Sequence, residues 1–227
     1  KINLVSFLEK KVKSFVLRAR TTKAQALALE TYWEKFGIKK QCKDSLDKIF
    51  GRKAKRILDI GFGAGDTLLS LAKNNPNKDF IGIEVHKSGV GAVINSAKKL
   101  SIENIRIAQE DAFVFLQDLK FNQAFEATIL FFPDPWPKTK HKKRRLIQED
   151  FITILERITI KGGYFICKTD WEDYALHIFK LFNENNRWAK FTFQDLPTLY
   201  RCLPMTNFER KARNDNRKST FIVFQKV

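Results

Sequence analysis

The stretch RILDIGFGAGD at residues 56–66 decides the fold of this chain. A short apolar run is followed by three glycines at alternate positions and then by a helical pattern over residues 67–73, which predicts a buried strand, a tight turn and a helix. Glycines let the backbone approach a ligand where a side chain would collide with it. We therefore expect a nucleotide-like cofactor at this turn, beside the start of the helix.

Further apolar runs follow at residues 80–85, 105–108, 127–132 and 164–168, and most of the intervals are long enough for a helix. Strands and helices that alternate in this way predict an α/β fold with a doubly wound, mostly parallel sheet. Residues 219–226 are rich in β-branched and aromatic side chains, and we expect a last strand there, antiparallel to its neighbour.

Residues 1–50 read as a basic N-terminal extension, and residues 51–227 as the main domain. A helical pattern covers residues 24–36, with Thr21 or Thr22 as its cap and Gly37 at its end. Basic side chains precede and begin this helix: Lys10, Lys11, Lys13, Arg18, Arg20 and Lys23.

The chain has 42 Lys and Arg against 25 Asp and Glu, a formal charge of +17. Such an excess favours an anionic partner such as nucleic acid. No apolar run reaches the ~18 residues that span a membrane, and the first 20 residues mix charges too closely for a signal peptide. We expect a cytoplasmic protein, as a monomer or homodimer.

The cysteines and histidines show no metal-ligand spacing. The three cysteines form no CxxC and are odd in number, so neither a disulfide framework nor a zinc site is indicated. We predict no metal. The residues concerned are Cys42, Cys167, Cys202, His86, His141 and His177.

The spacing of Gly61, Gly63 and Gly65 is GxGxG, whereas dinucleotide folds carry GxGxxG. Asp59, directly before this turn, would repel a diphosphate but suits the amino group of a methionine moiety. The pattern therefore favours S-adenosylmethionine, with S-adenosylhomocysteine as product, over NAD. A tight turn without a ligand is the alternative for the glycines alone.

Two more acidic residues follow the next predicted strands. Glu84 can accept both ribose hydroxyls of an adenosine, and Asp111 can accept from the adenine amino group, with Ala112 and Phe113 beside the ring. Carboxyl ends of parallel strands share one edge of the sheet, so we expect these acids to converge there. Alternatively, each is a solvated carboxylate that caps a helix.

The fourth predicted strand leads into PDPWP at residues 133–137. Three prolines forbid a helix and stiffen the loop, which fixes the directions of Asp134 and Trp136. An aromatic face stacks on a purine, and a carboxylate accepts hydrogen bonds from a guanine edge. The alternative is a stiff loop with Trp136 packed in the core.

A basic run follows directly, with Lys or Arg at six of the eight positions 138–145. Beside a base pocket such a run would neutralise phosphates and give salt-sensitive binding. A solvated charged face is the alternative. The residues expected to contact RNA are Lys140, His141, Lys142, Lys143, Arg144 and Arg145.

The sequence here resembles the bacterial-type tRNA (guanine-N7-)-methyltransferase family. The motifs that carry the resemblance are LDIGFGAG from Leu58, IGIEVHKSGVG from Ile81, EDA from Glu110, FFPDPWPKTKHKKRRL from Phe131, KTDWEDYA from Lys168 and TNFERKAR from Thr206. SFVLRARTTKAQ from Ser14 is also similar, so the resemblance covers nearly the whole chain from that residue.

The resemblance implies a Rossmann-like class I S-adenosylmethionine-dependent methyltransferase that acts on the variable-loop guanine, position 46, of tRNA. It makes Asp134 the catalytic residue, and places the cofactor around Asp59, Gly61, Gly63, Gly65, Glu84, Asp111, Ala112 and Asp134. It assigns substrate binding to Lys138, Asp170, Thr206, Asn207, Phe208 and Glu209. Two departures weaken the C-terminal assignments: Asn207 stands for the usual Lys, and residues 214–218 replace a Gly-rich, aromatic segment.

Three other functions are compatible with parts of this pattern. A methyltransferase for a small molecule or a protein amine would not need the charges at 138–145. An RNA-binding module would have a degenerate cofactor site, yet the glycines and the three acids are intact. An NAD enzyme is disfavoured by the glycine spacing.

Overall fold

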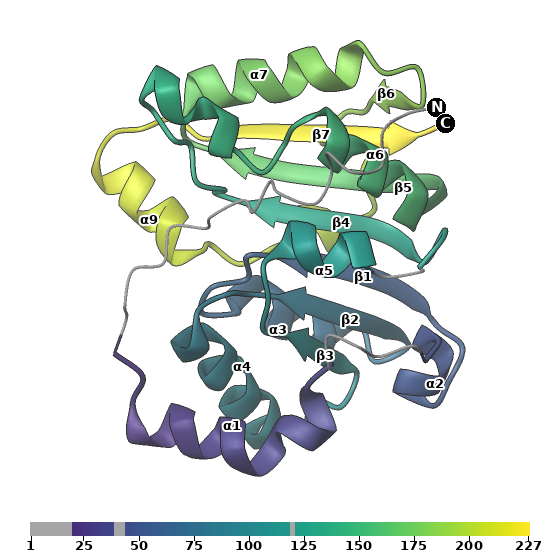
Figure 1. Cartoon of the computed structure of the whole chain (residues 1–227), viewed down its shortest axis with the longest axis vertical. Helices are drawn as coiled ribbons and strands as arrows, with labels where there is room; N and C mark the ends of the chain where they lie inside the picture. Colours follow the sequence, from purple (N-terminus) through teal and green to yellow (C-terminus); the bar gives the residue numbers. More distant parts are fainter. Residues whose placement is uncertain (1–19, 39–43, 119–120) are drawn as a thin grey trace.

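The computed structural model describes residues 20–38, 44–118 and 121–227. Seven strands form one sheet in the order β3-β2-β1-β4-β5-β7-β6 (Figure 1). The strands are β1 (Lys55–Ile60), β2 (Lys78–Ile83), β3 (Ile105–Ala108), β4 (Phe125–Phe131), β5 (Thr159–Thr169), β6 (Trp188–Lys190) and β7 (Thr220–Lys226). Strands β1 to β5 pair in parallel, and β7 is antiparallel to β5. The predicted mostly parallel sheet with a reversed last strand is confirmed.

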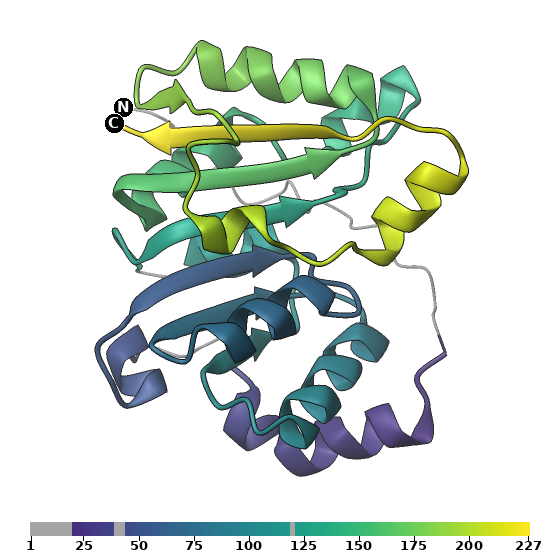
Figure 2. The same cartoon turned by 180° about the vertical axis from the view of Figure 1, so that it is seen from behind.

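Helices cover both faces of the sheet, as the views from the front and from behind show (Figures 1 and 2). The elements are α1 (Lys23–Phe36), α2 (Leu46–Phe50), α3 (Asp66–Asn74), α4 (Lys87–Lys99), α5 (Ala112–Asp118), the 3-10 helix η2 (Thr139–Arg144), α6 (Glu149–Ile158), α7 (Glu172–Asn183), α8 (Thr198–Arg201) and α9 (Asn207–Asn214).

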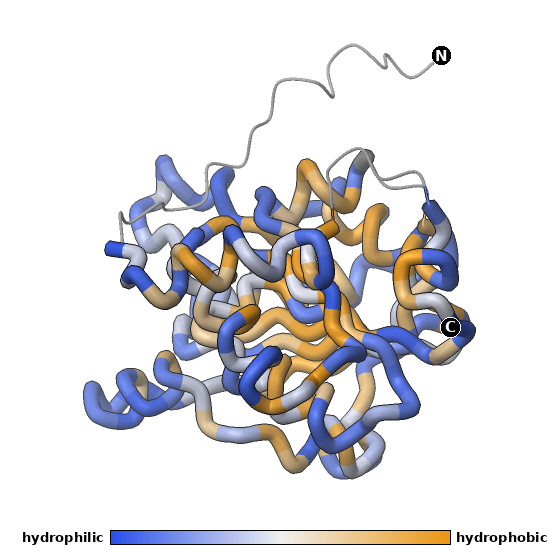
Figure 3. The backbone as a smooth tube through the Cα atoms, turned by 90° about the horizontal axis from the view of Figure 1, so that it is seen from below, coloured by the Kyte–Doolittle hydropathy of each residue, from blue (hydrophilic) through white to orange (hydrophobic). Residues whose placement is uncertain are grey.

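The side chains of each strand alternate between two apolar layers. In β1, Leu58 and Ile60 pack with α5, α6 and α7, whereas Ile57 packs with α1, α3 and α4. Alternation follows from the two-residue period of a strand. The apolar strands fill the centre of the molecule and polar segments surround them (Figure 3).

Helix α1 joins the domain through its apolar face. Thr22 caps it in a capping box with Gln25, and Ala28, Leu29 and Phe36 are buried in the layer that includes α4. Beyond the helix, the Ile38 amide donates to the Ile107 carbonyl at 2.8 Å, which extends the sheet edge at β3. The basic residues Lys10 to Arg18, residues 14–19 of the motif that begins at Ser14, and Cys42 lie outside the described residues.

Two strands differ substantially from the prediction, whereas β2 and β4 each begin only two residues earlier than predicted. β5 begins at Thr159 rather than 164, because residues on both sides of Gly162 and Gly163 pair with β4 across a register shift. The three-residue strand β6 was not predicted, since so short a segment has no readable period. Within the described residues, no helix is both long and apolar enough to cross a membrane.

Candidate active site

The glycine turn connects β1 to α3 at the carboxyl edge of the sheet. Gly61, Gly63 and Gly65 all have left-handed backbone, with φ of 69°, 56° and 84°. A Cβ on Gly65 would lie 2.2 Å from Cγ2 of Val93, whereas a Cβ on Gly61 or Gly63 would meet no atom within 4 Å. The first two glycines are therefore required by backbone conformation, and the space beside them is open to a ligand.

Asp59 is the buried acid behind this turn. It is 3% exposed, and its Oδ2 has no hydrogen-bond partner within the described part of the chain. Burial, and then the negative charge of Glu84, raise the pKa of Asp59 to about 7. An unpaired buried carboxylate is costly, and a cationic group beside it would remove that cost. Asp59 also lines a small hollow with Gly61 and Gly63, so the site fits an ammonium group.

Glu84 joins the end of β2 to the glycine turn. Its Oε2 accepts from the Gly63 amide at 2.9 Å, and its Oε1 accepts from the amides of Val85 and His86 at 2.7 and 2.9 Å. Three backbone donors fix a carboxylate in place. Glu84 therefore orders the turn as well as facing the pocket, and only the second role was predicted from the sequence.

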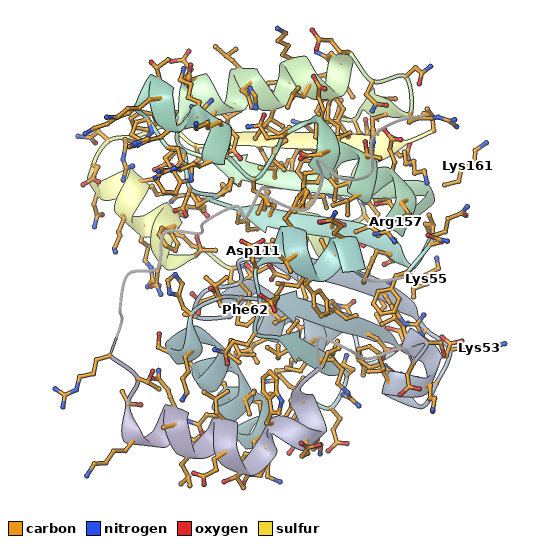
Figure 4. All side chains as sticks on the ribbon, in the orientation of Figure 1. Lys53, Lys55, Phe62, Asp111, Arg157 and Lys161 are labelled. Carbon is orange, nitrogen blue, oxygen red and sulfur yellow. The ribbon has the colours of Figure 1, made fainter. Side chains whose placement is uncertain are left out.

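Asp111 begins helix α5. Its Oδ1 accepts from the amides of Phe113 and Val114 at 2.9 and 3.3 Å, which is the capping role that the sequence left open. Asp111 and Ala112 also line the same pocket as Glu84, so capping and ligand contact are compatible. Figure 4 shows Asp111 and Phe62 on the side of the sheet toward which the β4 arrow points.

One pocket of about 210 Å³ joins the predicted cofactor residues to the reaction loop, residues 133–137. Residues from the ends of four strands line it, together with the loop, η2 and α9. Among them are Gly61, Gly63, Glu84, Asp111, Ala112, Phe132, Asp134, Trp136, Arg144 and Phe208. Glu84 and Asp111 thus converge as the sequence predicted, whereas Asp59 lines the neighbouring small hollow, which shares Gly61 and Gly63 with this pocket.

The reaction loop has unusual backbone at both ends. Phe132 and Trp136 have φ of 52° and 42°, which costs non-glycine residues of order 1–3 kcal/mol each. Trp136 is half-buried at the pocket, not in the core; the Arg144 guanidinium lies over its ring at 5.0 Å, and His141 meets it edge-on at 5.8 Å. Asp134 is exposed at the pocket rim.

The basic segment, residues 138–145, forms the short helix η2 and its flanks. Lys138, Lys140, Lys143 and Arg144 are exposed. Lys142 donates to Asp173 at 2.7 Å. Partial burial, followed by the charges of Arg144 and the neighbouring lysines, lowers the pKa of His141. The outward part of the segment is accessible to a polyanion.

Arg145 departs from the prediction for this segment. It is 1% exposed; its Nε donates to the Pro135 carbonyl at 2.9 Å, and its guanidinium pairs with Asp173. A buried guanidinium with these partners does not face a phosphate. We therefore correct its assignment as an RNA contact. A run of cations in a sequence does not show which side chains are buried. Here Arg144 is exposed, whereas its neighbour Arg145 is buried.

The predicted substrate residues beside α9 are held in ion pairs. Glu209 pairs with Lys168 at 2.6 Å, and Asp170 pairs with Arg217 at 2.7 Å. Neither Lys168 nor Arg217 was predicted from the sequence to have a role at the site. For Lys168, the available signal was its place in the motif KTD at a strand end, two residues before Asp170.

The segment Thr206 to Glu209 borders the pocket. The Thr206 hydroxyl accepts from the Glu209 amide at 3.1 Å and begins α9. Phe208 stacks on Phe132 with ring centroids 6.3 Å apart and lines the pocket. Asn207 bonds to Arg210 within the helix. In the described chain, no group of three His, Cys, Asp or Glu side chains is arranged to hold a metal ion.

The fold and the pocket define the class of protein: a Rossmann-like, class I S-adenosylmethionine-dependent methyltransferase. The crystal structure of the aminoglycoside resistance methyltransferase NpmB1 has this fold, with a TM-score of 0.55 and 15% identity over 82% of this chain and 94% of that one. A family model described as "Putative methyltransferase" matches residues 53–222.

Curated relatives identify the family within this class. The tRNA (guanine-N(7)-)-methyltransferase of Nitrosococcus oceani is 41% identical over 92% of this chain and 88% of its own length. That of Hydrogenovibrio crunogenus is 37% identical over 96% and 92%. The chain belongs to the tRNA (guanine-N(7)-)-methyltransferase family, and the resemblance predicted from the motifs is confirmed.

Proposed function

We propose that this chain transfers the methyl group of S-adenosylmethionine to N7 of the variable-loop guanine, position 46, in tRNA. The observation that carries the proposal is that Asp134 and Trp136 line the same pocket as Gly63, Glu84 and Asp111. A base-binding loop and a nucleoside-binding edge thus share one space. The names of the curated relatives support tRNA and N7 as the target.

Four residues would hold the cofactor. The buried carboxylate of Asp59 suits the amino group of the methionine moiety, and Glu84 suits the ribose hydroxyls. Asp111 and Ala112 suit the adenine ring. When bound, S-adenosylmethionine supplies a methyl group activated by a positively charged sulfur.

The reaction needs no general base on the protein. Guanine N7 has an in-plane lone pair, so it attacks a methyl group without first losing a proton. The residues must instead exclude water, orient N7, and stabilise the positive charge that spreads into the purine. Asp134 does this by accepting hydrogen bonds from guanine N1 and the exocyclic amine, which become more acidic during the transfer.

The other pocket residues orient the nucleotide. Trp136 offers an aromatic face for stacking, and the Phe132–Phe208 pair forms an apolar wall. The nucleotide is also bound by polar side chains: Lys138, Asp170, Thr206, Asn207 and Glu209. RNA phosphates contact the exposed cations Lys138, Lys140, Lys143 and Arg144, and the half-buried His141 and Lys142 of the same segment.

Methylation of an unmodified tRNA transcript tests the proposal. The chain is incubated with labelled S-adenosylmethionine and the transcript, and the nucleosides are then analysed. We expect 7-methylguanosine, and its loss when position 46 is changed to adenine. Label without 7-methylguanosine would overturn the reaction, and undiminished 7-methylguanosine in the changed transcript would overturn the position.

Three further features belong to the same proposal. Residues 1–50 act as a basic extension of a methyltransferase domain at 51–227, the protein works in the cytoplasm, and it acts as a monomer or homodimer without an obligate protein partner. Removal of residues 1–19 is expected to weaken tRNA binding more than cofactor binding, because four of the six cations of the basic stretch lie there.

A further inference from the structure

Arg145 is the largest side chain buried below 2% exposure in the described parts of the chain. Arginine is almost never fully buried unless it is paired, because its charge loses the solvation of water. A buried arginine inside a run of exposed cations therefore needs a specific reason.

The partners of Arg145 lie on two different elements. Its Nε donates to the Pro135 carbonyl at 2.9 Å, within the reaction loop. On α7, the guanidinium pairs with the carboxylate of Asp173 and lies over the ring of Tyr174 at 4.7 Å. Arg145 thus links the loop to a helix packed on the sheet.

The segment after Arg145 is fixed to the same helix. The Ile147 amide donates to the Tyr174 hydroxyl at 3.1 Å, and the Ile147 carbonyl lies 3.0 Å from Nε2 of His177. Hydrogen bonds from Lys142 and Arg145 lower the pKa of Asp173 to about 2. The carboxylate therefore stays charged at neutral pH and keeps its attraction for Arg145 there.

The Pro135 carbonyl belongs to the planar peptide that joins Pro135 to Trp136. A hydrogen bond to this oxygen fixes the orientation of the peptide plane and therefore helps to hold the φ angle of Trp136. That angle is 42°, a value that residues other than glycine rarely adopt. We infer that Arg145 is a positioning residue: it holds the Pro135–Trp136 peptide so that Asp134 and Trp136 face the pocket.

Arg144 and Arg145 then have complementary tasks. Arg144 lies over the Trp136 ring from the exposed side, whereas Arg145 holds the backbone of the same loop from the buried side. The basic segment is accordingly an RNA contact on its outer face and a support for the reaction loop on its inner face. The effect of Arg145 on methyl transfer rests on the proposed function, whereas its effect on the backbone of the loop does not.

Kinetics on tRNA separate positioning from RNA contact. Arg145→Gln is expected to lower kcat by on the order of 10²-fold, as misplaced reacting groups do, with KM for tRNA nearly unchanged. Arg145→Lys should restore part of kcat. Lys143→Gln should raise KM and leave kcat near normal, and Lys161→Gln, at the opposite edge of the sheet (Figure 4), should change neither.

A fluorine NMR measurement tests the same inference without activity. The chain contains four Trp, and 5-fluorotryptophan labelling gives each a signal; Trp136→Phe assigns that of Trp136. We expect Arg145→Gln to shift or broaden this signal and to spare those of Trp33 and Trp188, whereas Lys143→Gln should move none of these three signals. If Arg145→Gln does not fold, Asp173→Asn breaks the same link from a half-exposed residue.

An unmoved Trp136 signal in Arg145→Gln or Asp173→Asn would overturn the inference. So would a rise in KM without a fall in kcat, because that is the behaviour of an RNA contact. If the unmodified chain makes no 7-methylguanosine, the proposed function fails, while the fluorine signal still decides whether Arg145 positions Trp136.

Discussion

The cofactor half and the reaction half of the pocket are built differently. In the cofactor half, at the ends of β1 to β3, backbone amides do most of the fixing: Gly61 donates to the Ile83 carbonyl at 2.8 Å, and Gly63 donates to Glu84. In the reaction half, side chains from distant positions in the sequence fix the backbone. Arg145 fixes the Pro135 carbonyl, and the Lys168–Glu209 ion pair fixes α9.

The difference matches what each half must bind. A small cofactor returns to the same place in each cycle, and backbone bonds inside a packed sheet give a preformed site for it. A folded RNA must enter and leave. The Asp170–Arg217 pair, with the Arg217 side chain 40% exposed, is of a type that contributes about 0–1 kcal/mol, so the segment after α9 is held less firmly than the glycine turn.

Asp134→Ala is expected to give the largest separation of the two halves. Loss of one preorganised electrostatic group costs about 10²–10³-fold in kcat, whereas binding of S-adenosylmethionine should survive at least in part because Asp59, Glu84 and Asp111 remain. Steady-state kinetics and calorimetry measure the two quantities. Asp134→Asn, which keeps one acceptor oxygen, should be intermediate; near-normal turnover in the alanine variant would exclude the orienting role.

Gly65→Ala should damage the cofactor half alone. The left-handed backbone costs alanine roughly 1–2 kcal/mol, and the contact with Val93 adds about 1–3 kcal/mol of overpacking. Gly162→Ala is the matched control, because its φ is 76° and a Cβ there meets nothing within 4 Å. Urea unfolding and cofactor affinity measure the effects. Equal losses in both variants would mean that the turn has no packing requirement.

The same division explains what the sequence could predict. The glycines, Asp59, Glu84 and Asp111 act through local backbone and the ends of consecutive strands, so their convergence follows from the order of elements. The loop at 133–137 was predictable because proline acts locally. These parts of the site were predicted from spacing alone.

The supports of the reaction half were not predictable. Arg145 and Asp173 are 28 residues apart in sequence, and nothing in a run of cations distinguishes the buried one. Likewise Arg217 reaches Asp170 from the segment that departs from the family pattern. Such contacts depend on how helices pack, which spacing in a single sequence does not encode.

The pH dependence of cofactor binding sharpens the description of Asp59. Its pKa of about 7 means that the free chain holds a proton there below pH 7, and an ammonium group must displace that proton. Affinity for S-adenosylhomocysteine should therefore fall about tenfold per pH unit between roughly pH 7 and 5. Asp59→Asn should bind weakly with a flat profile. If the affinity of the unmodified chain does not change with pH, Asp59 does not bind the amino group.

Lys143→Gln should give the smallest effect, and one confined to the reaction half. Lys143 is exposed, so loss of one phosphate contact should weaken tRNA binding a few-fold and reduce the slope of log Kd against log salt by about 1. Filter binding over a salt series measures this. Lys161→Gln removes the same charge far from the pocket (Figure 4) and should keep the full slope. If the slope falls equally in both variants, RNA binding depends on the total charge of +17 and not on a specific contact with the basic segment.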